Sequence, residues 1–139
     1  MYNSAEEIRE IILDEIVKLK DTWILSEFSN RYFFTTVGRD LEGYYIFSDI
    51  QGYHFIYSER GQDTTHYITG NIFEIIYWVI SSLTSSLAIN CMSEETGEIS
   101  NQRKYILDKQ LELLSIIGGN IRKAGEIEIS ESLKNNPLE

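Results

Sequence analysis

Cysteine, proline and basic residues are scarce in this chain of 139 residues. Cys91 is its single cysteine, so no disulfide can form within it, and Pro137 is its single proline. Secreted domains of this size often carry several disulfides, so the cysteine count favours a reducing cytosol. Twelve Lys and Arg residues stand against twenty-two Asp and Glu residues, giving a formal charge of −10. Because a DNA or RNA binder needs a basic surface, we expect no nucleic-acid partner and instead a partner with a cationic face.

A signal peptide and a membrane span are not predicted either. Residues 1–7 include neither the basic stretch nor the apolar stretch of a secretory signal. Residues 75–92 carry no charge, but they include six polar residues, namely Ser81, Ser82, Thr84, Ser85, Ser86 and Asn90. Acidic residues flank this stretch, and no Lys or Arg lies nearby to orient it in a bilayer. We therefore expect a buried helix of a soluble, cytoplasmic protein that has no membrane partner.

Local patterns predict a single α+β domain over residues 1–139. Ser4 and Glu7 form a capping-box pattern before an amphipathic run, which predicts a helix over residues 4–20. Aromatic and β-branched segments predict strands over residues 31–37, 44–48, 53–59 and 64–69. Their connections are short enough for hairpins, so the sheet should be an antiparallel meander of three to four strands. Alternation in the third strand places large side chains on both faces of the sheet.

Two or three helices should follow and pack on the sheet. A cap at Asn71 predicts a helix to about Asn90, whose serines permit close approach of a neighbouring helix. A leucine-rich stripe that includes Leu111 and Leu114 predicts another helix over residues 100–117, which ends at the glycines 118–119. We also assign residues 120–133 to a helix that stops before Pro137.

Candidate catalytic and metal-binding residues are few. Glu59, Asp63 and His66 come nearest to a metal-ligand pattern, but a second His or Cys at ligand spacing is missing. A metal-dependent hydrolase that uses these three residues stays open as a minor alternative. Cys91 lies near the end of an apolar helix, where a buried thiol is inert, and the helix serines have no neighbouring His. We therefore expect no enzyme activity, no bound metal and no cofactor.

Acidic residues and tyrosines indicate a protein-binding surface instead. Residues 61–102 contain no Lys or Arg. If the turns of the meander met the loop 93–97 at one end of the sheet, they would form an anionic rim beside exposed tyrosines, as protein–protein hot spots do. The residues expected on this surface are Asp49, Tyr53, Tyr57, Glu59, Arg60, Asp63, Glu94, Glu95 and Glu98. The alternative is that the tyrosines build the core.

Three segments, in order along the chain, resemble a known family. They read Gly-Tyr-His-Phe-Ile-Tyr-Ser-Glu-Arg-Gly at residues 52–61, Glu-Ile-Ile-Tyr-Trp-Val-Ile at residues 74–80, and Lys-Gln-Leu-Glu-Leu-Leu at residues 109–114. The tyrosine-rich strand that ends in Glu-Arg-Gly is the most specific of them. Together they make the region from about residue 49 to residue 138 similar to the immunity protein 63 family of bacterial polymorphic-toxin systems.

The resemblance implies a small cytosolic protein, encoded beside a toxin, that binds the toxin domain and blocks it. The family pattern places Glu59 and Arg60 at the turn after the strand. We assign a structural role to the other motif residues, namely Gly52, Gly61, Tyr77, Trp78, Leu111 and Leu114. Residues 94–98 are acidic where the family pattern is more basic, so this loop either carries toxin specificity or reflects drift.

The predicted function is thus an immunity protein that neutralises a cognate bacterial toxin by stoichiometric occlusion. Many toxin payloads are nucleases with cationic active sites, and an acidic inhibitor can mimic their substrate and be steered onto them. The alternative function is a small cytosolic ligand-binding or adaptor domain with a tyrosine-lined pocket between the sheet and the helices. The oligomeric state stays open.

Overall fold

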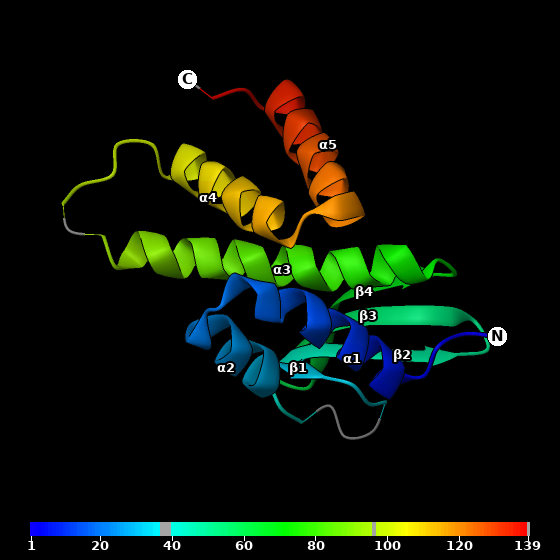
Figure 1. Cartoon of the computed structure of the whole chain (residues 1–139). Helices are drawn as coiled ribbons and strands as arrows, with labels where there is room; N and C mark the ends of the chain where they lie inside the picture. Colours follow the sequence, from blue (N-terminus) through cyan, green and yellow to red (C-terminus); the bar gives the residue numbers. More distant parts are fainter. Residues whose placement is uncertain (37–39, 96, 139) are drawn as a thin grey trace.

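In chain order, the strands of a four-stranded sheet follow one group of helices and precede a second group (Figure 1). The computed structural model describes residues 1–36, 40–95 and 97–138. The chain starts with α1 (Ala5–Ile16), the short 3-10 helix η1 (Val17–Leu19) and α2 (Thr22–Arg31). The sheet contains β1 (Tyr32–Phe33), β2 (Gly43–Asp49), β3 (Gly52–Glu59) and β4 (Gln62–Thr69). α3 (Ile72–Ser93), α4 (Gln102–Ile117) and α5 (Gly119–Asn135) follow, so the fold is α+β as predicted.

The sheet is mixed, which differs in part from the prediction. Its strand order is β1-β2-β3-β4, and β2, β3 and β4 form the predicted antiparallel meander. β1 is only two residues long and pairs parallel to β2. The register pairs Tyr32 with Tyr44 and Phe33 with Tyr45, so β1 and β2 are not joined as a hairpin. Val37, the end of the predicted strand, and the connector residues Gly38 and Arg39 lie outside the described residues.

Glycines shape both hairpin turns of the meander. Gly52 has a φ angle of 137°, and a Cβ at this position would lie 2.7 Å from the backbone oxygen of Thr69 on the neighbouring strand. Gly61, in the turn after β3, has a φ angle of 77°. L-residues with a side chain rarely adopt these backbone angles, so the backbone geometry favours glycine at both positions.

The N-terminal helix begins at the predicted cap. The Ser4 side chain accepts a hydrogen bond from the Glu7 amide, and the Glu7 side chain accepts one from the Ser4 amide. This capping box orients the helix so that its isoleucines face the interior. The isoleucines that are fully buried are Ile8, Ile12 and Ile16.

A second helix, α2, is not among the elements predicted above. Its first turn is capped by Asp21, whose carboxylate accepts a hydrogen bond from the Ile24 amide at 2.9 Å. Ile24 and Phe28, four residues apart, lie on one side of the helix and are buried in the main core. α2 therefore packs against α3 and completes this part of the main core.

α3 is the central helix of the fold. It contacts the sheet, α1, α2, α4 and α5, and Figure 1 shows it between the sheet and the α4–α5 pair. By length and hydropathy alone α3 would suit a membrane span, but half of its most apolar window is buried inside the protein. Its fully buried residues include Ile75, Val79, Ile80, Leu83 and Ala88. It is thus a core helix, as predicted.

The last two helices pack against each other and on α3. α4 ends at Ile117 and is capped by Gly118, whose φ angle is 77°. α5 covers Gly119–Asn135, so it includes the predicted helix over residues 120–133 and extends beyond it at both ends. A Cβ at Gly125 of α5 would collide with the Leu114 side chain of α4, so the two helices approach closely at this point. The buried side of α4 consists of Gln110, Leu113, Leu114 and Ile117.

Candidate partner-binding surface

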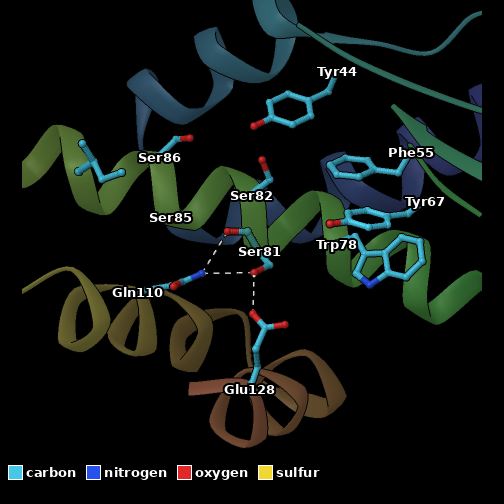
Figure 2. A pocket seen from close by; sticks show the side chains of 11 residues that line it. Tyr44, Phe55, Tyr67, Trp78, Ser81, Ser82, Ser85, Ser86, Gln110 and Glu128 are labelled. Carbon is cyan, nitrogen blue, oxygen red and sulfur yellow. Dashed lines mark hydrogen bonds between the residues drawn. The ribbon is translucent and has the colours of Figure 1, made fainter. Parts of the chain in front are cut away.

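A groove of about 510 Å³ runs along one side of α3, between the sheet and the α4–α5 pair (Figure 2). Aromatic side chains from the sheet and α3 form one wall, serines of α3 form the floor, and polar side chains of α4 and α5 form the other wall. The lining residues are Tyr44, Phe55, Tyr67, Trp78, Ser81, Ser82, Ser85, Ser86, Ile89, Gln110 and Glu128. Serine side chains are small, so they leave the space between these elements unfilled.

The aromatic wall is part of a ladder of rings that crosses the sheet. The ring centroids of Tyr32 and Tyr44 lie 4.7 Å apart, and those of Tyr44 and Phe55 lie 5.3 Å apart. Trp78 lies 6.5 Å from Phe55 and 5.6 Å from Tyr67. The register explains this order because it pairs Phe55 of β3 with Tyr67 of β4, on one face of the sheet. Tyr67, at the open end of the ladder, is 56% exposed.

Hydrogen bonds to α3 fix the polar wall. The Gln110 amide nitrogen lies 3.1 Å from the backbone oxygen of Ser81 and 3.3 Å from the Thr84 hydroxyl. The Ser81 hydroxyl donates to the Glu128 carboxylate at 3.4 Å (Figure 2). Burial, together with the neighbouring Glu128 carboxylate, raises the pKa of Tyr77 to about 12. Tyr77 therefore stays neutral at physiological pH, and Glu128 carries the charge of this wall.

The groove offers one negative charge and no positive one. Glu128 is the single acidic residue among its lining residues, and that set contains no Lys or Arg. β4 and α3, which supply much of the lining, fall within residues 61–102, where the sequence has no Lys or Arg. Rings, hydroxyls and one carboxylate together suit a ligand that carries hydrogen-bond donors and a positive charge.

The turns of the meander do not meet in one anionic rim. Consecutive hairpin turns lie at opposite ends of a sheet, so Asp49 lies at one end while Glu59, Arg60 and Asp63 lie at the other. The expectation of a single rim is therefore corrected by the hairpin geometry.

The three other acidic residues predicted on the surface follow α3. Glu94, Glu95 and Glu98 are exposed, at the end of α3 that extends beyond the sheet (Figure 1). The Glu94 carboxylate accepts a hydrogen bond from the Asn90 side-chain Nδ2 at 3.2 Å, and the Glu95 carboxylate accepts one from the Tyr105 hydroxyl at 3.1 Å. Thr96, within the predicted loop 93–97, lies outside the described residues.

The two tyrosines predicted to contact a partner are held by the fold. Tyr53 is 2% exposed, and its hydroxyl both donates to the Asn3 side chain and accepts from the Asn3 amide, each at 2.9 Å. Tyr57 is partly buried, its hydroxyl lies 3.5 Å from the Arg31 guanidinium, and burial raises its pKa. Tyr53 is thus a core residue. Tyr67, which the sequence does not mark as a contact residue, takes the exposed position in the groove.

The motif residues given a structural role divide between core and groove. Tyr77 is buried, Leu114 is fully buried and Leu111 is partly buried. Trp78 packs against the main core but also lines the groove, so it is a candidate contact residue as well.

A hydrogen-bond chain that the sequence does not predict joins Asp49 to both histidines. His54 Nε2 lies 2.8 Å from an Asp49 carboxylate oxygen, and His54 Nδ1 lies 2.9 Å from His66 Nε2. The Phe47 ring stacks on His54 with centroids 4.5 Å apart. The hydrogen bond from His54 holds the pKa of the Asp49 carboxyl below its usual range. His54 and His66 are brought together only by the register of β3 and β4, so the neighbouring residues in the sequence do not predict these hydrogen bonds.

The candidate catalytic residues do not gather into a site. Burial raises the pKa of the Cys91 thiol, which disfavours the nucleophilic thiolate. The His66 side chain is hydrogen-bonded to His54. Glu59 lies opposite Gln62 in the strand register, next to the turn between β3 and β4. Within residues 1–36, 40–95 and 97–138, no group of three or more His, Cys, Asp or Glu side chains converges as metal ligands would.

Comparison with known proteins gives one family match. Residues 44–131 match the family model described as Immunity protein 63. The match covers more than half of the chain, from β2 into α5, and it includes every lining residue of the groove. It agrees with the resemblance of the three segments noted above. Neither a curated protein nor a solved structure matches the chain.

Proposed function

The chain belongs to the immunity protein 63 family, and from this membership we propose that it binds a cognate bacterial toxin and neutralises it by stoichiometric occlusion. Membership indicates an immunity function in general, and it implies a toxin as the partner. The family match is the observation that carries the proposal, because it covers the antiparallel strands β2 to β4, α3 and α4. In this proposal the protein performs no chemistry and acts in the cytoplasm, where it meets the toxin.

The charge of the chain supports a toxin with a cationic face, such as a nuclease. A nuclease active site is cationic because it holds phosphate, and an inhibitor with a formal charge of −10 would be attracted to it. Electrostatic steering raises association rates to about 10⁸ M⁻¹s⁻¹ at low salt. The exposed carboxylates of Glu94, Glu95 and Glu98, together with the Glu59–Asp63 end of the sheet, are the proposed sources of steering.

Co-purification with the product of the adjacent toxin gene tests this proposal. We expect a one-to-one complex that weakens as salt increases, because screening reduces the attraction between opposite charges. A complex that forms equally well at low and high salt would keep the immunity function and remove the steering. Absence of a complex at either salt concentration would contradict the immunity function itself.

Charge reversal then tests where steering originates. The double variant Glu94→Lys/Glu95→Lys should lower the association rate about tenfold and change the dissociation rate little, since exposed rim charges act mainly on encounter. The matched control Glu10→Lys/Asp14→Lys changes net charge equally on exposed positions of α1. Stopped-flow mixing at low salt measures both rates. Equal slowing by both double variants would show that net charge, not the loop after α3, drives association.

The groove also supports the second candidate function, a small ligand-binding domain. Its volume of about 510 Å³ and its aromatic wall resemble a site for a small molecule. A panel of metabolites, screened by thermal unfolding, separates this function from the first. Stabilisation by one metabolite, together with no binding to the toxin, would favour the ligand-binding function.

A further inference from the structure

We infer that the groove beside α3 receives a lysine or arginine side chain of the toxin. The inference rests on the proposed function and names the chemistry of the contact. It follows from three properties of the groove: the exposed Tyr67 ring beside the partly buried Trp78 ring, a carboxylate that has no cationic partner among the described residues, and hydroxyl groups along the floor.

The rings supply the first element of recognition. Tyr67 and Trp78 lie 5.6 Å apart between ring centroids, and Tyr67 is 56% exposed. A cation within about 6 Å of a Trp or Tyr ring face is attracted by the negative charge of that face. Ile89, which is 48% exposed in the same groove, offers an apolar contact for the aliphatic part of a long basic side chain.

Glu128 supplies the charge. Its carboxylate extends from α5 toward Ser81 (Figure 2) and is exposed. Glu126 on the same helix is already paired with Arg122 at 2.6 Å, whereas Glu128 forms no ion pair with any residue that the structure describes. A guanidinium or ammonium group in the groove would give Glu128 that missing partner, in a charge-assisted hydrogen bond.

The other lining residues and the position of the groove favour a cationic side chain that belongs to a protein. Ser85 and Ser86 place hydroxyl groups, which can accept hydrogen bonds, along the floor. A phosphate or carboxylate ligand would meet the Glu128 charge without a Lys or Arg among the lining residues to offset it. Tyr67 belongs to β4, the exposed edge strand of the sheet, so a protein that docks at this edge lies next to the groove.

The test compares the affinity of single variants for the purified toxin domain by isothermal titration calorimetry. Glu128→Gln should weaken binding about tenfold, as loss of one charge in a hydrogen-bonded pair does. Tyr67→Leu should weaken binding severalfold because it removes a ring face, whereas Tyr67→Phe keeps the ring and should bind as the wild type does. Glu131→Gln removes an exposed carboxylate from the same helix outside the groove, and it should leave the affinity unchanged.

The outcomes separate the two claims. Wild-type affinity for Glu128→Gln overturns the inference while leaving the proposed function in place. Failure of the wild-type protein to bind the toxin contradicts the proposed function, and the inference falls with it. Analytical ultracentrifugation of the free chain tests whether a second copy of the chain occupies the groove instead. A wild-type dimer that becomes a monomer in Glu128→Gln would place the second copy there and would also overturn the inference.

Discussion

The two sides of α3 differ in composition and in what they contact. One side carries large aliphatic residues, among them Ile75, Val79 and Leu83, which are fully buried in the main core. The other side carries serines, which line the groove (Figure 2). Aliphatic side chains exclude water and hold the neighbouring elements in place, while serines leave room for a ligand. A single helix can therefore stabilise the fold on one side and shape a binding site on the other.

The largest expected effect is on stability, on the core side. Leu83 is fully buried, so Leu83→Ala should lower the free energy of unfolding by about 3 kcal/mol through lost burial and the cavity left behind. Urea unfolding followed by circular dichroism measures this loss. The folded fraction should bind the toxin as tightly as the wild type does. A loss of less than about 1 kcal/mol would mean that this side of α3 does not hold the core.

A change of intermediate size is expected on the groove side. Ser85→Phe should fill part of the groove and weaken toxin binding about tenfold, because the bulky ring occupies the space proposed for the partner. Its free energy of unfolding should change by less than about 1 kcal/mol, since the added ring extends into open space. Ser130→Phe, at an exposed position of α5 outside the groove, is the control for the added ring. Unchanged toxin affinity in Ser85→Phe would show that the groove is not part of the toxin-binding surface.

The smallest expected effect comes from Gln110, a residue of α4 that lines the groove and is also buried against α3. Gln110 lines the groove, yet it is 7% exposed and its amide lies 3.1 Å from the backbone oxygen of Ser81. Gln110→Leu should lower the free energy of unfolding by about 1 kcal/mol, the usual net value of a buried hydrogen bond. Gln102→Leu, at the exposed start of α4, should change it by less than about 0.5 kcal/mol. Greater stability of Gln110→Leu than of the wild type would show that this bridge between α3 and α4 does not support the fold.

Local signals account for the elements that were predicted correctly. The capping box of Ser4 and Glu7, the Asn71 cap and the glycines that end α4 are read from a few neighbouring residues. α2 has comparable signals in its Asp21 cap and in the spacing of Ile24 and Phe28, but they are brief and run directly into the aromatic segment that predicts a strand. The parallel pairing of β1 places Tyr32 beside Tyr44 of β2, an alignment that no local pattern specifies.

The groove could not be predicted because it joins residues far apart in the sequence. The strand register places Phe55 beside Tyr67, Trp78 reaches both rings from α3, and Glu128 comes from α5. The serines of α3 were visible as a small face, but the sequence does not show that α4 and α5 cover only part of it. The same limit explains Tyr53: alternation assigns it to a face of the strand, whereas its burial depends on helices that pack there.

Titration of the toxin with this protein tests the central claim most directly. The measurement is the remaining activity of a fixed amount of toxin as the protein is added in increasing amounts. Stoichiometric occlusion is expected to reduce the activity in proportion to the protein added, with complete inhibition at one equivalent. Complete inhibition at a small fraction of an equivalent would show turnover and contradict occlusion, and undiminished activity at a large excess would contradict neutralisation altogether.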